Sequence, residues 1–362
     1  MRADIFCRVV DNYGDIGVCW RLARRLREGH DWQLRLWVDN LEAFARLQPQ
    51  IDPALEAQQL GGIEIRRWDD AASDTPGEVV IEAFACDPPA RFVAAMRAQP
   101  QPPVWINLEY LSAEDWVQDC HGLPSMRPDG LRKHFFFPGF TARTGGLIRE
   151  AGLTQARDGW QADAAARAAF LRELGVVRAQ PDSRLVTLFC YPHAPYLEMA
   201  RALASRPTLL LAPQGVAPGL EAAAGGLLQI ARIPFVTQPD FDRLLWSADL
   251  NFVRGEDSFI RAAWAARPLV WQIYPQDDDV HLDKLHAWLQ HYPAPPAARE
   301  LLLRWNTPQT PADWAGTLSA ALDGSHWAQW QNRARQWDAE QAARPDLGDS
   351  LVKFCADIIN SR

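Results

Sequence analysis

The spacing of hydrophobic residues near the N-terminus predicts a strand, a tight loop and a helix. β-Forming side chains over residues 4–10 alternate in the manner of a pleated, mostly buried strand. From Ile16 to Leu26, apolar residues return at helical spacing, and the arginines among them are mostly free to face water. Gly29 supplies a signal for the end of this helix. A strand therefore leads into a helix through a short loop.

The same alternation of strand and helix patterns continues through the first half of the chain. Strands are expected at 33–38, 62–68, 79–84, 104–108 and 134–137, and helices at 40–47 and 91–98. Residues 79–84 are almost continuously apolar, which is typical of a parallel strand covered on both faces. This βα rhythm predicts an α/β domain with a parallel, doubly wound sheet.

The second half repeats the rhythm after a break in the pattern. Residues 151–178 are rich in alanine and arginine, with a helical stretch at 164–174, and Gln180-Pro181-Asp182-Ser183 then interrupts the chain. Beyond it, strands are expected at 185–191, 208–212, 228–233, 250–253 and 269–273, and helices at 199–204, 241–246, 280–291, 311–322, 325–343 and 350–359, with one more beginning near Ser258. We therefore expect a first domain over 1–152, a linker region over 153–182 and a second domain over 183–345.

Composition narrows the class of protein. The chain has 362 residues, of which 48% are hydrophobic and 23% charged, and these values are ordinary for a globular protein of two domains. A net charge of −8 argues against a broad basic surface for nucleic acid. The six cysteines are scattered without a C-x-x-C pair, and no apolar run approaches the length of a membrane span. We expect a reduced, cytoplasmic protein that binds neither nucleic acid nor a membrane.

The loop after the first strand, residues 10–17, is the first candidate site. It carries two carboxylates, Asp11 and Asp15, and two glycines, Gly14 and Gly17. In open α/β sheets ligands bind just beyond the carboxyl ends of the strands, and a carboxylate there can take a proton or orient a nucleophile. The alternative is structural: Asp15 caps the helix, and Asp11 belongs to an ordinary turn. Spacing alone leaves both readings open.

A second candidate site lies where residues 254–259 leave a strand and open a helix. Amide groups at a helix N-terminus bind phosphate, and Glu256 or Asp257 could accept a hydrogen bond from a ribose hydroxyl. The alternative is a helix capped by Asp257 or Ser258, as at many strand-to-helix turns. Three adjacent acids, Asp277-Asp278-Asp279, could hold a divalent cation, but they lack a fixed ligand spacing, and we favour a solvated loop.

Several enzyme classes lack their motifs here. The sequence has no G-x-S-x-G elbow of a serine hydrolase and no Walker A sequence of an ATPase. After the first strand only Gly14 and Gly17 are present, which does not match the G-x-G-x-x-G fingerprint of a dinucleotide enzyme.

The loop and three later stretches resemble one known family. Residues 11–24, Asp-Asn-Tyr-Gly-Asp-Ile-Gly-Val-Cys-Trp-Arg-Leu-Ala-Arg, closely resemble the opening motif of the bacterial elongation factor P arginine rhamnosyltransferases. Residues 254–259 resemble the donor-diphosphate motif of that family, and residues 189–192 and 237–241 resemble its base-binding elements. The likeness extends over nearly the whole chain.

This resemblance implies a fold and a reaction. It implies a GT-B fold of two Rossmann-like domains facing a cleft, with the C-terminal helix in residues 346–362 returning to the first domain. It also implies an inverting transfer of L-rhamnose from dTDP-β-L-rhamnose to an arginine of elongation factor P, without a metal or other cofactor. Asp15 would be the general base, assisted by Asp11. The implied donor-binding residues are Tyr13, Gly14, Gly17, Phe189, Tyr191, Gln238, Phe241, Glu256, Asp257 and Ser258.

Two other functions remain open from the sequence. One is a GT-B relative with another nucleotide-sugar donor or acceptor, and the other is a non-catalytic protein that binds elongation factor P. Phe189 and Phe241 also have a structural alternative, since aromatic side chains after strands often belong to the core. Residues 107–112 and the loop at Gly145-Gly146 follow strands of the first domain and are candidates for the acceptor surface.

Overall fold

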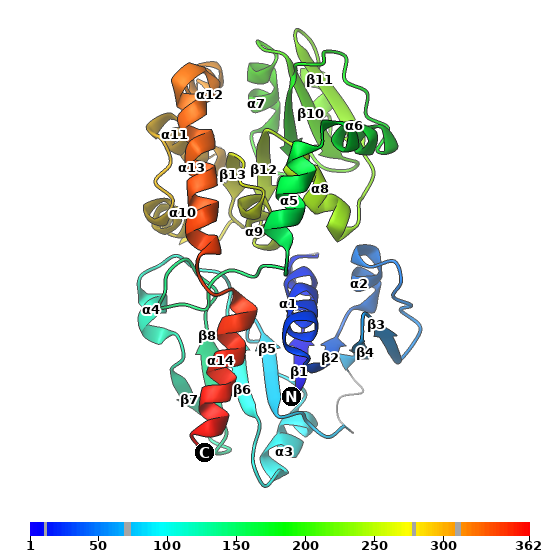
Figure 1. Cartoon of the computed structure of the whole chain (residues 1–362), viewed down its shortest axis with the longest axis vertical. Coiled ribbons are helices and arrows are strands. Elements are labelled where there is room, and N and C mark those ends of the chain that lie inside the picture. Colours follow the sequence, from blue (N-terminus) through cyan, green and yellow to red (C-terminus); the bar gives the residue numbers. More distant parts are fainter. Residues whose placement is uncertain (11–12, 69–73, 277–279, 308–312) are drawn as a thin grey trace. The chain divides into compact units, whose positions relative to one another are not determined.

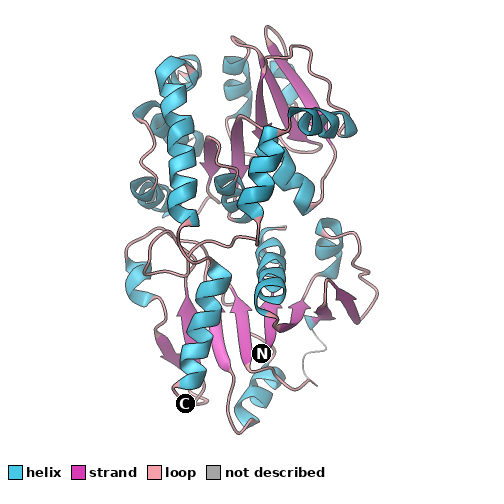
Figure 2. Cartoon of the chain, in the orientation of Figure 1, coloured by secondary structure: helices cyan, strands magenta, loops and turns pink. Residues whose placement is uncertain are grey.

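The computed structural model describes residues 1–10, 13–68, 74–276, 280–307 and 313–362 and divides into two compact units. Unit 1 comprises Met1–Ala151 and Gln341–Arg362, and unit 2 comprises Gly152–Glu340. In each unit, helices flank a central sheet, as the cyan and magenta elements of Figure 2 show. Among the described residues, no helix has both the length and the apolar character needed to cross a membrane.

Unit 1 is built on an eight-stranded sheet in the order β3-β4-β2-β1-β5-β6-β8-β7 (Figure 1). Its strands are β1 Arg2–Cys7, β2 Gln33–Val38, β3 Ala57–Leu60, β4 Ile63–Arg67, β5 Val79–Ala83, β6 Val104–Leu108, β7 Pro124–Met126 and β8 Arg132–Phe136. Its helices are α1 Gly14–His30, α2 Leu41–Leu47, α3 Ala90–Ala98, α4 Trp116–Cys120 and α14 Leu347–Asn360.

The sheet of unit 1 departs from the predicted all-parallel arrangement at its two edges. The edge strands β3 and β7, together with helix α4, have no counterpart in the prediction, and both strands pair antiparallel with their neighbours β4 and β8. These strands are only four and three residues long, with alternating partly exposed side chains, so they carry little hydrophobic signal. The six inner strands, including the fully buried β5 and β6, are parallel as predicted.

The first strand ends earlier than its hydrophobic pattern suggests. β1 stops at Cys7, whereas the sequence predicts a strand to Val10. The backbone N–H of Val9 donates to Asp39 Oδ1 at 2.9 Å, and that of Val10 donates to Asp15 Oδ2 at 2.8 Å. Side-chain carboxylates therefore take the donors that a longer strand would use in the sheet.

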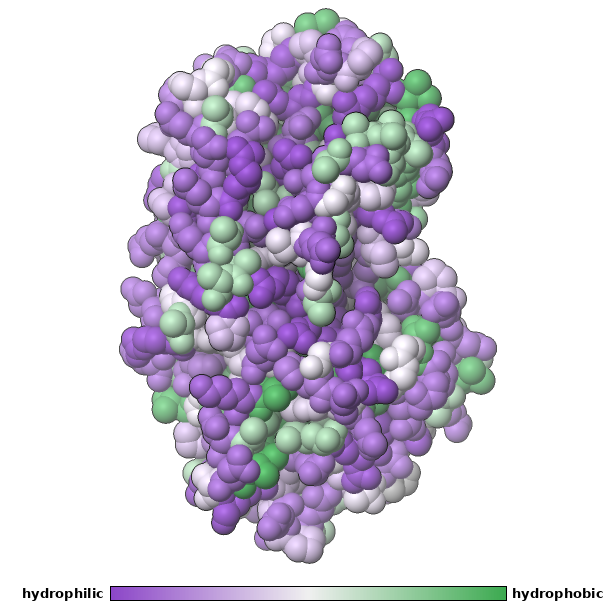
Figure 3. Space-filling view, viewed as in Figure 1, coloured by the Kyte–Doolittle hydropathy of each residue, from purple (hydrophilic) through white to green (hydrophobic). Residues whose placement is uncertain are grey.

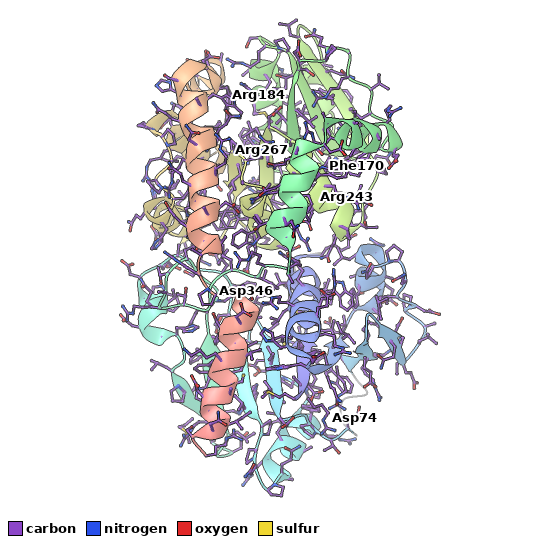
Figure 4. The ribbon with its side chains drawn as sticks, viewed as in Figure 1. Asp74, Phe170, Arg184, Arg243, Arg267 and Asp346 are labelled. Carbon is purple, nitrogen blue, oxygen red and sulfur yellow. The ribbon has the colours of Figure 1, made fainter. Side chains whose placement is uncertain are left out.

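The C-terminal helix α14 packs on unit 1, as predicted. Asp346 caps this helix and also accepts two hydrogen bonds from Arg25 of α1, at 2.9 and 2.7 Å. Figure 4 shows Asp346 at the start of α14, beside α1. Phe354 packs its ring against His134 and Phe136 of β8. The last helix thus completes the layer that covers one face of the first sheet.

Unit 2 contains a five-stranded, all-parallel sheet in the order β11-β10-β9-β12-β13. Its strands are β9 Arg184–Leu188, β10 Thr208–Pro213, β11 Leu228–Ile233, β12 Leu250–Arg254 and β13 Leu269–Gln272. Its helices are α5 Leu153–Ala162, α6 Ala164–Glu173, α7 Tyr196–Leu203, the short 3₁₀ helix η2 Leu220–Ala223, α8 Gln238–Ser247, α9 Asp257–Trp264, α10 Val280–His291, α11 Pro296–Asn306, α12 Trp314–Leu322 and α13 Gly324–Ala342. Together the two units give the doubly wound α/β architecture that the sequence predicts.

The residues expected as a linker, 153–182, fold as part of unit 2. Helices α5 and α6 occupy most of this segment, and Phe170 and Leu171 of α6 enter the hydrophobic core under β9 and β10. In α5, Arg157 is buried. Its guanidinium donates to the carbonyl of Trp264 and pairs with Asp338 at 2.8 Å, and these partners compensate for the loss of water. The polar composition of α5 conceals these contacts, since buried arginine requires partners that lie far away in sequence.

Each sheet has one topological switch point, where successive strands change direction across the sheet. In unit 1 the chain runs from β1 to β2 and β4 on one side, then to β5, β6 and β8 on the other. In unit 2 it runs from β9 to β10 and β11, then to β12 and β13. Ligands of open α/β sheets bind at these points, beyond the carboxyl ends of the strands. The loops after β1, β5, β9 and β12 are therefore the candidate ligand-binding segments.

Candidate active site

Asp15 lies at the switch point of unit 1, in the first turn of α1. Its side chain is buried, with 3% exposed, and Oδ2 accepts the hydrogen bond from Val10 described above. The helix begins at Gly14, and its N-cap is Tyr13, which makes no side-chain capping bond. The alternative that Asp15 caps the helix is therefore wrong: its carboxylate holds the incoming loop instead. A negative charge in the first turn is also favoured by the helix dipole.

The other predicted residues of this loop make different contacts. The carbonyl of Tyr13 accepts from the N–H of Gly17 at 2.9 Å, and Arg46 of α2 donates to the Tyr13 hydroxyl at 3.4 Å. Gly14 is the first residue of α1, and Gly17 is buried in its first turn. Asp11 lies outside the described residues.

Two arginines of α1 differ from the prediction that they face water. Arg21 is 1% exposed and forms a two-pronged ion pair with Glu150, at 2.7 and 2.8 Å. Arg25 is held by Asp346, as described above, and by Asp349 of α14 at 2.6 Å. Helical spacing placed both on a polar face, but α1 is covered on that side by segments distant in sequence. These ion pairs fix the helix that presents Asp15.

The loop after β5 has a strained backbone. Phe84, Ala85 and Asp87 all have positive φ angles, of 57°, 52° and 49°, although none is glycine. Such conformations cost about 1–3 kcal/mol each and persist only where surrounding contacts impose them. Here the N–H of Phe84 donates to Leu108 O at 2.7 Å, and the N–H of Ala85 donates to Asn107 Oδ1 at 3.0 Å. The neighbouring strand β6 therefore holds this loop in place.

In unit 2, the loop after β9 brings two predicted aromatic residues together. Phe189 and Phe241 of α8 contact edge to face, with ring centroids 4.8 Å apart. Both rings are half-buried, and Phe189 also packs against the hydrophobic core. Part of the Phe189 ring therefore contributes to the core, as the structural alternative predicts. The pair still leaves aromatic surface at the switch point.

Gln238 is the first residue of α8 and is 6% exposed. Within the described part of the chain, its Nε2 is buried and has no hydrogen-bond acceptor. Thr237 caps the helix, so Gln238 is not needed for that purpose. A buried amide without a partner costs about 1–3 kcal/mol, and a ligand carbonyl would remove that cost.

Tyr191 sits in a polar and aromatic cluster at the ends of β9, β12 and β13. Its backbone N–H donates to Gln272 Oε1 at 2.8 Å, and Arg254 lies over its ring at 5.0 Å. Arg254 also donates to the carbonyl of Cys190 at 2.7 Å. The edge of Tyr274 meets the same ring at 5.5 Å. Gln272 was not predicted, because a glutamine inside an apolar strand gives no sign of a partner in another loop.

The turn after β12 opens α9 with Glu256 at the N-cap position, where its side chain makes no capping bond. Ser258 is half-buried in the first turn. Asp257 does not cap the helix either: its Oδ2 accepts from Arg261 Nε at 2.8 Å. Arg261 also donates to both carboxylate oxygens of Asp242 of α8, at 2.9 Å each.

Arg261, 3% exposed, therefore joins the two helices that carry the predicted base and diphosphate residues. The sequence analysis missed it, although the i, i+4 spacing from Asp257 is a detectable signal. No group of three potential metal ligands occurs among the described residues, which do not include Asp277, Asp278 and Asp279.

Comparison with known proteins shows the family of the chain. The sequence profile of the family described as "Elongation-Factor P (EF-P) rhamnosyltransferase EarP" matches residues 3–356. The chain belongs to this family. The protein-arginine rhamnosyltransferase of Pseudomonas putida is 50% identical to it, with 97% of each chain covered. That of Pseudomonas aeruginosa is 47% identical, with 98% of each chain covered.

Solved structures place this EarP family member among the GT-B glycosyltransferases. A structure described as the basis for EarP-mediated arginine glycosylation of translation elongation factor EF-P aligns with a TM-score of 0.66 and 37% identity, over 98% of this chain and 99% of that one. MurG of Acinetobacter baumannii aligns with a TM-score of 0.53 at 12% identity, over 100% of this chain and 99% of the other, and shows the fold alone. The predicted fold and family are thus confirmed, whereas the roles of individual residues stay predictions.

Proposed function

We propose that this protein transfers L-rhamnose from dTDP-β-L-rhamnose, with inversion, to a guanidinium nitrogen of one arginine of elongation factor P in the bacterial cytoplasm. Family membership over residues 3–356 carries the proposal. The curated relatives are named protein-arginine rhamnosyltransferases, and EF-P appears in the description of the related structure. The donor and its stereochemistry come from the motif resemblance.

Asp15 suits the role of general base in this reaction. The guanidinium has a pKa above about 12, so its proton cannot be removed in a separate first step. A carboxylate that binds the guanidinium localises its charge and orients one nitrogen toward the sugar. The bond from nitrogen to C1 forms as the bond from C1 to the diphosphate oxygen breaks, and the nitrogen's proton passes to the carboxylate. Asp11 would be the second carboxylate at the guanidinium.

The roles of the donor residues come from the motif resemblance, and the contacts of these residues within each unit support them. Gln238 Nε2 would donate to a carbonyl of thymine, and Phe241 with Phe189 would contact the face of the ring. Glu256 and Ser258 at the start of α9 would receive the ribose and the diphosphate, with the helix amides as donors. The resemblance also implies donor contacts for Tyr191, whose ring is largely buried, and for Tyr13, Gly14 and Gly17 of unit 1. Asp257 would act mainly through its ion pair with Arg261.

The intact mass of elongation factor P after incubation with the protein and dTDP-β-L-rhamnose tests the proposal. A gain of one deoxyhexose, absent with Asp15→Asn, is the expected result. Donor binding without a mass gain would favour another acceptor. A complex with elongation factor P that forms without any transfer, and equally well with Asp15→Ala, would identify a non-catalytic binding protein instead.

A further inference from the structure

The strained loop after β5 and the loop after β6 together present an aromatic surface that no role in donor binding uses. Phe84 and Tyr110 stack with ring centroids 4.2 Å apart and an interplanar angle of 12°. Tyr110 is 46% exposed, and Phe84 is half-buried. Stacked aromatic rings usually belong to a core, so a pair on the surface held by strained backbone needs an explanation.

This pair lies near the candidate base within unit 1. β5 is hydrogen-bonded to both β1 and β6, so the loops after these three strands leave the sheet side by side. Cys86, within the strained loop, donates from Sγ to the carbonyl of Phe6 at 3.4 Å. Phe6 belongs to β1, the strand that leads into the loop before Asp15, so the strained loop contacts the element that precedes the candidate base.

A carboxylate accompanies the aromatic pair. Glu109 precedes Tyr110, is half-buried, and accepts from Asn107 Nδ2 at 2.5 Å. Asn107 also accepts from the N–H of Ala85, so one amide ties the strained loop to Glu109. Burial raises the pKa of Glu109. A cation placed beside the Glu109 carboxylate would favour its charged form.

We propose that the stacked rings of Phe84 and Tyr110, with Glu109 beside them, form the surface against which the guanidinium of the acceptor arginine lies. The inference rests on the proposed function and specifies how the acceptor is recognised. A guanidinium is planar and weakly hydrated, and it stacks on aromatic faces while its N–H groups bind a carboxylate. Tyr110 is then a specificity residue for arginine, whereas Asp15 handles the proton.

A double-mutant cycle tests this contact. Binding of elongation factor P, and of its variant with alanine at the target arginine, is measured by calorimetry in the presence of dTDP, for the wild-type protein, Tyr110→Phe and Tyr110→Leu. Leucine keeps an apolar side chain but removes the aromatic face. We expect Tyr110→Leu to weaken binding of the wild-type acceptor by about tenfold. We expect no change for the alanine acceptor, and Tyr110→Phe should bind both as the wild type does.

Other outcomes separate the two proposals. Equal losses for both acceptors, or no loss for either, would overturn the contact between Tyr110 and the target arginine while leaving the transfer reaction intact. Absence of rhamnose transfer by the wild-type protein would refute the proposed function itself. Phe84→Gly provides a second variant, since glycine accepts the positive φ and the variant removes the aromatic side chain. It should show the same selective loss for the arginine acceptor.

Discussion

The loops at the two switch points hold different kinds of groups. In unit 1 the loop after β1 presents a buried carboxylate, Asp15, which a backbone N–H fixes at 2.8 Å. In unit 2 the loop after β9 and the helices α8 and α9, which follow β11 and β12, present aromatic rings, the buried amide of Gln238, and carboxylates linked by Arg261. Under the proposed function, one sheet edge would move a proton and the other would bind an uncharged ring and an anion. The same topology would then support chemistry in one unit and recognition in the other.

The strongest test of this division is Asp15→Asn. Asparagine keeps the shape but cannot take the proton, so kcat should fall about 100- to 10,000-fold while the donor Kd stays within about twofold. Asp39→Asn is the matched control, because Asp39 also accepts a backbone hydrogen bond from the loop, at Val9, but is exposed. Steady-state kinetics and donor titration give both values. A near-normal kcat for Asp15→Asn would show that Asp15 is not the base, and the proposed division of roles between the two units would be wrong.

Arg261→Ala tests the rigidity of the binding edge. Removing this buried guanidinium leaves Asp257 and Asp242 facing each other, which should lower the free energy of unfolding by about 3–5 kcal/mol and weaken donor binding. Urea denaturation measures the first effect and calorimetry the second. Arg243→Ala breaks a more exposed i, i+3 pair with Asp240 in the same unit and should cost less than about 1 kcal/mol. Equal losses for the two variants would show that Arg261 has no special role.

Gln238→Met tests whether Gln238 binds the base of the donor. Since Nε2 has no acceptor among the described residues, its loss should leave the thermal stability unchanged or slightly higher. The donor Kd should rise a few-fold to about tenfold. Gln161→Met is the opposite case: its Nε2 donates to Ala265 O at 2.8 Å, so stability should fall and donor binding should not change. A destabilised Gln238→Met with normal donor binding would reverse the assignment.

Removal of metal ions should have the smallest effect. If helix N-termini and side chains bind the diphosphate, EDTA should leave the rate of transfer within about twofold. The control is the same assay with added magnesium. Strict dependence on magnesium would make Asp277, Asp278 and Asp279 candidate ligands and would change the description of the donor site.

The face of the molecule shown in Figure 3 has no large apolar patch that would mark another binding site. Hydrophilic side chains dominate this face, and apolar residues form small, scattered patches. Scattered exposed apolar side chains are normal on a globular protein, so the switch-point loops remain the best-defined candidates.

Several strands have the predicted bounds. They are the inner strands 33–38 and 104–108 of unit 1 and the edge strand 228–233 of unit 2, because turn signals bound each of these hydrophobic patterns. The edge strands β3 and β7 of unit 1 were missed because they are short and half-exposed. Arg21 was predicted to face water, and the contacts of Arg157 were not predicted, because each buried arginine pairs with a carboxylate far away in sequence, about which periodicity contains no information.

The sequence by itself determined the two βα-rich halves and the family, because hydrophobic spacing and local motifs encode them. It also predicted candidate loops at residues 10–17, 189–192 and 254–259. It did not determine what those loops do in three dimensions. Only the tertiary structure showed that Asp15 binds Val10 instead of capping α1, that Asp257 pairs with Arg261, and that Phe84 and Tyr110 stack on strained backbone. The first two contacts are local, but spacing alone does not tell a capping carboxylate from one that binds a loop or an arginine. The stack of Phe84 and Tyr110 joins two loops that lie side by side because β5 pairs with β6 in the sheet.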